Sequence, residues 1–353
     1  MSASDIQVQP IRIRDLVRLR SMRTDALMPD QSHGPFGNRM ADPWSAMPVT
    51  RRARKSFVAY LDGQVVGLID LVSDPANHRW VLSRVLTCRQ LPTDGTTAGR
   101  DAVWRELILQ AIRAAGATRA KRIHAVLAED SPVIPALVST GFTEYAHDTV
   151  LLAQELPHIV PTGIVRRQEP SDVWAIHQLY HQVTPRPVQY AEALTSNYWS
   201  RVVPGQSPAR SYVVEDGLEI VAHCRVTQGC DGPMLHLMAH PDAHGLVVPV
   251  LRDVLHDLGP LGKRTMAVIV PDYLQEYIDP IESLGFEPGG RQSRLVKYTV
   301  VAQRMQFRGV EELAKDVPER VAARTPTLTY VPSGDSDQSS RQSNRSQKQY
   351  GIS

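Results

Sequence analysis

The sequence predicts an α/β fold, in the broad sense that includes α+β, built as two similar units in tandem. Each unit is expected to hold a mostly antiparallel mixed sheet flanked by helices. The chain has 353 residues, the usual length of two domains. A strand-turn-strand pattern with an Asp-Gly turn occurs once in each half, and so does a later Gly-Phe pair. Both recur at a spacing of roughly 150 residues, which is typical of a duplicated unit.

The composition argues against a nucleic-acid-binding, membrane or secreted protein. Lys and Arg number 39 and Asp and Glu 37, a formal net charge of +2, so no general electrostatic attraction to nucleic acid or to an anionic membrane is expected. Three cysteines cannot all pair within one chain, and no apolar signal segment or membrane-length apolar run is present. We therefore expect a bacterial protein of the reducing cytoplasm, without nucleic-acid or membrane partners.

Each half opens with a short strand that leads into an amphipathic helix. In the first half this pattern begins at Val8, and Asp15 is expected to cap the helix N-terminus. In the second half it begins at Ile164, with Ser171 and Asp172 as the expected caps.

A β-hairpin follows in each half. The two hairpins are expected at Lys55–Val72 and Ala209–Val226, with turns at Asp62-Gly63 and Asp216-Gly217. Asp-Gly between strand-like runs is a strong hairpin signal because both turn positions favour a positive φ.

The remaining elements also occur in matching order. A strand, a helix, an apolar strand and a short helix ending at Gly-Phe precede a final pair of strands in each half. In the first half they are expected at Arg79–Thr87, Ala102–Ala115, Arg122–Ala128 and Leu137–Phe142. In the second half they are expected at Pro233–His240, Val247–Leu258, Thr265–Pro271 and Ile281–Phe286. The expected domains are residues 1–157 and 158–302, followed by a helical extension over 303–331 and a disordered tail over 332–353.

Two long connections separate the first helix of each half from its hairpin. Pro29–Arg54 carries Phe36 and Trp44, and Thr184–Ser207 carries three aromatic residues, Tyr190, Tyr198 and Trp199. Long loops over a rigid sheet often contact substrate, and a poorly ordered connection is the alternative.

This order of elements, with the Asp-Gly hairpin, the helix after the fourth strand and the late Gly-Phe, resembles the GNAT superfamily of acyl-CoA-dependent N-acetyltransferases. The resemblance implies transfer of an acetyl or other acyl group from acyl-CoA to an amine, with acetyl-CoA as co-substrate and no metal. It implies a small-molecule or peptide amine as acceptor and a monomer or homodimer. A catalytically silent GNAT-like binding protein is the alternative.

The resemblance also implies where acyl-CoA would bind. The fourth strand offers main-chain groups to the pantetheine, and the loop that follows offers N–H groups to the pyrophosphate. The corresponding residues of the second half are Met238, Ala239, His240, His244, Gly245, Leu246, Val247 and Val248, and those of the first half are Gly99 and Arg100. Both loops depart from the family's glycine pattern: Asp101 replaces a glycine in the first, and Val247 and Pro249 do so in the second.

Two residues of the second half are the expected catalytic groups. His236 lies on the strand face shared with Met234 and Met238, where it could be the general base toward the amine, and a structural histidine is the alternative. Many family members carry an acidic Tyr four residues before the Gly-Phe, where this chain has Leu137 and Ile281. Tyr277 is the expected substitute, and Tyr273 is the alternative. We favour the second unit as the active one and expect the first to be architectural.

Other clusters carry weaker signals. His177 and His181 are spaced as metal ligands on a helix, but they have no third ligand, so a structural role is expected. The basic cluster of Arg51, Arg52, Arg54 and Lys55 could recruit an acidic acceptor or the CoA phosphate, and a solvated junction is the alternative. Cys88, Cys224 and Cys230 are expected to be reduced.

Overall fold

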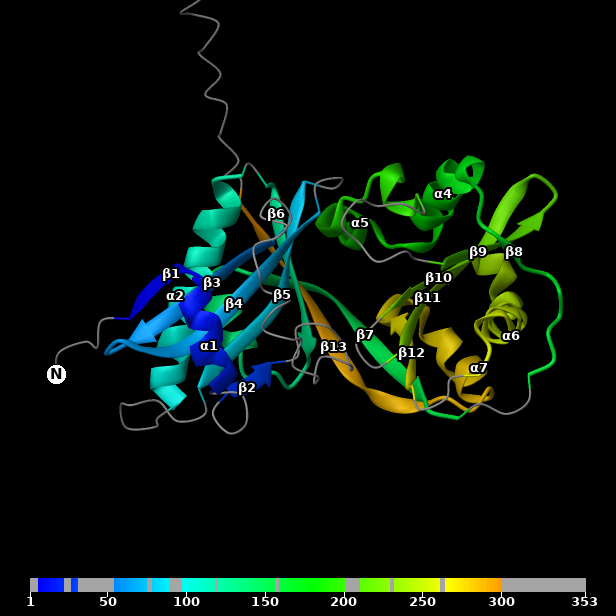
Figure 1. The fold of residues 1–353 in the computed structure, drawn as a ribbon. Coiled ribbons are helices and arrows are strands. Elements are labelled where there is room, and N and C mark those ends of the chain that lie inside the picture. The colour runs from blue at the N-terminus through cyan, green and yellow to red at the C-terminus, as the bar shows by residue number, and fades with distance from the viewer. Residues whose placement is uncertain are drawn as a thin grey trace, which may run out of the picture. The chain divides into compact units, whose positions relative to one another are not determined.

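The computed structural model describes most of the chain up to residue 299 (Figure 1). The described residues are 6–21, 27–30, 54–74, 78–88, 97–118, 120–155, 159–200, 210–228, 232–260 and 264–299. The expected loop aromatics Phe36 and Trp44, the helical extension and the C-terminal tail lie outside these ranges. No helix within them is long and apolar enough to cross a membrane.

Both halves contain the expected succession of strands and helices, with β2 added in the first half and α5, η6 and η8 added in the second. The first half holds β1 (Gln7–Pro10), α1 (Ile13–Ser21), β2 (Leu27–Asp30), β3 (Arg54–Leu61), β4 (Gln64–Asp74), β5 (Arg79–Cys88), α2 (Thr97–Gly116), β6 (Arg122–Ala128), α3 (Ile134–Ser139) and β7 (Thr143–Ala153). The second half holds β8 (Arg166–Arg167), η5 (Pro170–Asp172), α4 (Val173–Val183), α5 (Arg186–Glu192), η6 (Ser196–Trp199), β9 (Arg210–Asp216), β10 (Glu219–Gln228), β11 (Pro233–Ala239), η7 (Pro241–Leu246), α6 (Val247–Leu258), β12 (Met266–Pro271), η8 (Asp272–Tyr277), α7 (Ile278–Glu282) and β13 (Glu287–Tyr298).

The described strands of both halves form one continuous sheet. Its order is β1-β3-β4-β5-β6-β13-β7-β12-β11-β10-β9-β8, and β2 pairs with β5 off this path. The two halves belong to one compact unit that ends at Val301. The domain limits at 157 and 302 remain a prediction.

The halves exchange their last strands. β13 of the second half lies between β6 and β7, while β7 of the first half lies between β13 and β12 (Figure 1). The expected final pair of strands in each half is wrong, because each half ends in one long strand. The close approach of the exchanged pair requires a glycine, since a Cβ at Gly289 would lie 2.4 Å from the Leu152 side chain.

Helices cover the sheet in the way that the apolar patterns predict. On α2 the buried residues include Val103, Leu107, Ile108 and Ala111, which are four of the five residues of the expected apolar face. In the second half the strand side chains alternate, so that Val213 packs against α4 while Val214 packs into the core beside α6. The second half is therefore covered on both faces, by α4 and η6 on one and by α6 and α7 on the other (Figure 1).

The two hairpin turns differ from each other. At the first turn Asp62 and Gly63 have φ of 50° and 75°, as the type I′ turn requires. At the second turn the expected pair is shifted by one residue, because Asp216 is the last strand residue and pairs with Glu219. Gly217 has a φ of 64° and occupies the first loop position, where a type II′ turn needs a positive φ.

The two aspartates that were expected at the N-caps lie inside the first helical turn in both halves. Asp15 lies at the third position of α1, where its carboxylate accepts the Arg12 N–H at 2.8 Å. Asp172 accepts the Glu169 N–H at 2.6 Å from the equivalent position. Each carboxylate is buried and satisfies a free N–H at the helix start, which is a capping-box role. The shared geometry supports a duplicated origin.

Asp253 on α6 fixes the connection between the halves. Its carboxylate accepts the four main-chain N–H groups of Thr162–Val165, three of them at 2.7–3.1 Å. The Asp253 residue is only 5% exposed, and burial opposes its charge. The amide donors nevertheless hold the pKa of Asp253 below its ordinary value.

Replacing this carboxylate should destabilise the protein. Asp253→Asn removes charged acceptors from four amides, so we expect the free energy of unfolding to fall by about 1.5–3 kcal/mol. Urea denaturation at neutral pH measures the change. The matched control is Glu282→Gln, at an exposed carboxylate on α7. Equal stability of the two variants would contradict the anchoring role of Asp253.

Candidate active site

β11 and β12 part beside a large cavity in the second half. The two strands pair in parallel only where Met234–His236 faces Ala267–Ile269. On its other edge β11 bonds to β10, and the His240 N–H donates to the Val221 C=O at 2.8 Å. Because alternate residues of an antiparallel strand bond to the same neighbour, the main-chain groups of Leu237 and Ala239 point away from β10, toward β12. The last pair of the parallel ladder, His236 with Ile269, uses the Leu237 N–H, so the gap begins at the Leu237 C=O, opposite Pro271, which has no N–H.

The Tyr277 hydroxyl lies in this gap. It accepts the Ala239 N–H and donates to the Ala239 C=O, both at 3.1 Å. Tyr277 ends η8 and is 2% exposed. Burial is the main cause that raises the pKa of Tyr277 to about 12, so its hydroxyl keeps its proton at neutral pH. The expected acid thus lies at the gap but does not line the cavity, whereas the alternative acid, Tyr273, does line it.

His236 faces the cavity, together with Met234 and Met238 as the strand alternation predicts. Burial, followed by the positive charge of Arg294, lowers the pKa of His236 to about 4. The imidazole is therefore neutral at pH 7 and can accept a proton. Its position supports a chemical role without deciding between a base and a structural residue.

The cavity has a volume of about 680 Å³, within the range of small-molecule sites. Residues of both halves line the cavity, because the exchanged strands bring the sheet of the first half next to α4, α5 and η6 of the second half. Arg79 and Tyr145 come from the first half, while Tyr180, Tyr198 and Trp199 come from the second. The expected loop Thr184–Ser207 forms part of this wall through α5 and η6, as far as residue 200. Of its aromatics, Trp199 is buried and Tyr190 is 69% exposed.

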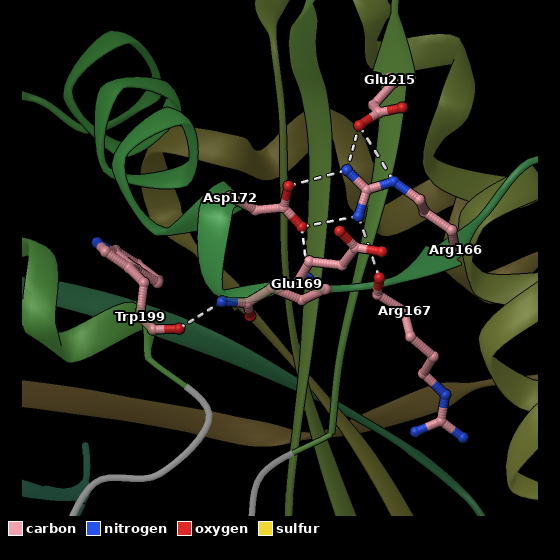
Figure 2. A network of polar contacts seen from close by, with 7 residues as sticks. Arg166, Arg167, Glu169, Asp172, Trp199 and Glu215 are labelled. Atoms are coloured by element: carbon pink, nitrogen blue, oxygen red, sulfur yellow. Dashed lines mark hydrogen bonds and ion pairs between the residues drawn. The ribbon is translucent and has the colours of Figure 1, made fainter.

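A polar network holds η6 in place (Figure 2). Arg166 is paired with Asp172 at 2.7 Å and also with Glu215. The Asp172 and Glu215 hydrogen bonds hold the pKa of Arg166 above its ordinary value. Next to this pair, the Gln168 side chain donates to the Trp199 C=O at 2.6 Å. The wall of the cavity is thereby joined to β8 and to the start of α4.

An ion-pair cluster lies where the exchanged strands meet the cavity. Arg294 on β13 binds Asp148 on β7 at 2.6 and 2.7 Å and Glu192 on α5 at 2.8 Å. Gln292 also donates to Asp148, at 2.9 Å. Asp148 is fully buried, so Arg294 and Gln292 compensate a charge that would otherwise be costly. The sequence analysis missed this cluster because only the exchange brings these residues together.

The loop after β11 carries the other expected cofactor residues. The His240 ring accepts the Asp242 N–H at 3.3 Å, and the His244 ring is bonded to the Pro241 C=O at 3.0 Å. A Cβ on Gly245 would meet nothing within 4 Å, so this glycine leaves open space at the start of α6. Leu246, Val247 and Val248 follow it, and all three pack into or against the core of the second half.

In the first half the equivalent strands, β5 and β6, also part, but another strand fills the gap between them. β5 and β6 pair only where Arg79–Val81 faces Arg122–His124. Beyond that point β2 pairs with β5 over Val85–Cys88, on the edge that does not face β4. The main-chain groups that face an open gap in the second half are therefore paired in the first. Gly99 and Arg100 lie in the first turn of α2 and do not line the cavity.

His177, His181 and Lys55 have structural partners. The His177 ring accepts from the Trp199 indole at 3.1 Å and lies 3.2 Å from the His181 ring nitrogen, which forms a hydrogen-bonded chain. Lys55 donates to the Ala114 C=O at 2.8 Å, and its ammonium lies over the Trp80 ring. Arg51 and Arg52 lie outside the described residues.

The described cysteines are buried. They are Cys88 and Cys224, and burial raises the pKa of the Cys224 thiol to about 12, which makes it unreactive. Cys230 lies outside the described residues. The described residues contain no group of three or more side chains that could hold a metal ion.

No family model matches the sequence, and no curated protein matches it. Among solved structures, the chain is similar to a tandem GNAT protein from the clavulanic acid biosynthesis pathway, with 16% identity, a TM-score of 0.48, and coverage of 84% of this chain and 100% of the other. It is also similar to a GCN5-related N-acetyltransferase from Sphaerobacter thermophilus (13% identity, TM-score 0.49, 84% and 96% covered). A putative acetyltransferase from Pyrococcus horikoshii gives 14% identity and a TM-score of 0.48, with 84% and 91% covered.

Buried neutral histidines at the cavity should make stability depend on pH. Burial is the main cause that lowers the pKa of His223 from 6.5 to about 3, and His223 is 1% exposed. The unfolded chain therefore binds a proton at His223 between these values while the folded chain does not, so stability falls as the pH drops below 6.5.

Replacing His223 should weaken this pH dependence. His223→Phe is expected to lose about 2 kcal/mol less stability than the wild type between pH 7 and pH 5. Urea denaturation at both pH values measures the difference. The control His256→Gln, at an exposed position on α6, should keep the wild-type dependence. A His223→Phe variant with the full dependence would contradict a buried neutral imidazole.

Proposed function

We propose that the chain is an acyl-CoA-dependent N-acyltransferase, and that its second unit transfers an acetyl or other acyl group to an amine. One observation carries the proposal: β11 parts from β12 beside a cavity that His236 lines, and the Tyr277 hydroxyl binds the Ala239 main chain at the gap. Acyl-CoA would supply the reactive thioester. The chain would supply the binding edge, a proton acceptor and a proton donor.

Each group has a role that fits its environment. The Ala239 N–H, once released by the Tyr277 hydroxyl, would polarise the acyl carbonyl as an oxyanion donor. His236 would take the proton that the amine loses when its nitrogen bonds to the acyl carbon. Tyr277 would give its proton to the sulfur as the carbon–sulfur bond breaks, which its raised pKa allows because the hydroxyl is protonated.

The binding residues fit the acyl-CoA in part. The gap at Leu237 and the open space at Gly245 suit a chain that passes along β11 toward the start of α6. The start of α6 at Leu246–Val248 would face the pyrophosphate, although the Val247 N–H already donates to the His244 C=O, and His240 and His244 would flank it. Pro249 has no N–H to offer. Met238 and Ala239 would contact pantetheine only if Tyr277 gave up its bonds to Ala239.

The second candidate is a catalytically silent binding protein, and a specific observation favours it. Tyr277 already occupies both main-chain groups of Ala239, and β2 closes the equivalent edge of the first half. A protein that had lost acyl-CoA would gain stability from such internal partners. Binding of acetyl-CoA to the full chain separates the two candidates.

Blocking the space at Gly245 tests the cofactor site. Gly245→Glu places a bulky carboxylate where pyrophosphate would lie, so we expect acetyl-CoA binding to be lost in isothermal titration. The control is Gly116→Glu at the end of α2, where a Cβ also meets nothing within 4 Å. Unchanged binding in Gly245→Glu would refute this site, and no binding in the wild type would favour the silent protein.

Removing the imidazole tests the base. His236→Gln should lower kcat by roughly 100- to 10,000-fold while acetyl-CoA binding stays unchanged. CoA release in the presence of an amine substrate measures kcat, and His256→Gln is the control. Full activity in His236→Gln would leave His236 with the structural role only.

A further inference from the structure

The cavity beside the gap carries more positive than negative charge. Among the described residues that line it, the arginines are Arg79, Arg225 and Arg294, and the carboxylates are Asp148 and Glu192. His236 is neutral there, as are His223 and His124, because burial lowers the pKa of each. The histidines therefore do not alter the excess of positive charge at neutral pH.

Both carboxylates form ion pairs with Arg294. It binds Asp148 through two nitrogens and Glu192 through a third, and Glu192 also accepts the Tyr180 hydroxyl at 2.8 Å. A cationic ligand would have to displace a buried guanidinium to reach either carboxylate. The cavity consequently offers little to a polyamine or another amine without negative charge.

Arg225 has no ion pair with a carboxylate among the described residues. Its residue is 6% exposed, its Nη1 donates to the Tyr198 C=O at 2.9 Å, and its guanidinium lies 4.5 Å from the Tyr198 ring centre. Its Nε has no hydrogen-bond partner among the described residues. Arginine keeps its charge in proteins, and a buried charge without an anion is costly. An anionic ligand would remove this cost.

The position of Arg225 connects that anion with the proposed chemistry. Arg225 on β10 lies directly opposite His236 on β11 in the strand register, and both side chains line the cavity. Directly opposite residues of an antiparallel pair are neighbours, with Cβ atoms about 5 Å apart. A small molecule that binds Arg225 would therefore also lie beside His236.

We infer that the acceptor amine carries a carboxylate, which Arg225 binds, so that the substrate class is amino acids. This rests on the proposed function for the transfer step, but binding of the carboxylate does not require acyl-CoA. The apolar side chains of Met234, Met238 and Leu274 leave the rest of the cavity suited to a hydrophobic side chain.

Matched pairs of amino acids and their decarboxylated amines test the inference on the full chain without acyl-CoA. The pairs are L-phenylalanine with phenethylamine, L-tyrosine with tyramine, and L-lysine with cadaverine, titrated calorimetrically. We expect at least one amino acid to bind, and to bind at least tenfold more tightly than its amine. Amines that bind as tightly as their amino acids, or no binding by any pair at millimolar concentration, would overturn the inference.

Variants of Arg225 test whether its side chain binds the carboxylate of the amino acid. Arg225→Gln should weaken amino-acid binding by roughly 10- to 100-fold, since charged hydrogen bonds are lost, and should leave amine binding unchanged. Arg225→Lys should keep part of the affinity, and Arg105→Gln on the exposed face of α2 should keep all of it. Wild-type affinity in Arg225→Gln would overturn the inference.

CoA release from acetyl-CoA separates this inference from the proposed function. Amino-acid-selective binding without any CoA release would contradict the acyltransferase and uphold the role of Arg225. Acyl transfer to phenethylamine as efficient as transfer to L-phenylalanine would uphold the acyltransferase and overturn the role of Arg225.

Discussion

The pairing of β7 with β13 is the interaction on which the rest of the structure depends. Each of these strands closes the sheet of the half to which it does not belong in sequence, and together they join all the described strands into one sheet. Without the exchange, each half would close its sheet with its own last strand, β7 on β6 and β13 on β12. Because the exchange makes the sheet of each half depend on a strand of the other, we expect the two halves to fold together.

The exchange also builds the candidate site. Asp148 reaches the cavity on β7 and Arg294 on β13, so the ion pair at the floor of the second unit's cavity contains one residue from each half. The two units have meanwhile diverged at the parting of their strands. β2 pairs with the free edge of β5, while on β11 the Tyr277 hydroxyl binds Ala239 and the Leu237 C=O faces the gap. This asymmetry supports the proposal that the second unit is the active one.

Local sequence signals predicted the elements well and their assembly only in part. The helix at Val247–Leu258 and the strand at Arg122–Ala128 have the predicted bounds, because apolar periodicity and clear breaks mark them. The strand exchange could not be predicted, since a strand's pattern does not say which neighbour it pairs with. For the same reason Arg225 and Arg294 were missed, although a charged residue on a buried strand face was a usable signal. Tyr277 was found through the resemblance, and its contact with Ala239 required the structure.

The central claim is that acyl-CoA lies along β11 at Leu237 and not along β5. Amide hydrogen exchange of the full chain, with and without acetyl-CoA, tests this most directly. The segment Ala239–Val248, from the end of β11 to the start of α6, should become more protected on binding, whereas the amides of Val85–Cys88, already paired with β2, should not change. Protection at Val85–Cys88, or binding without added protection at Ala239–Val248, would contradict the claim.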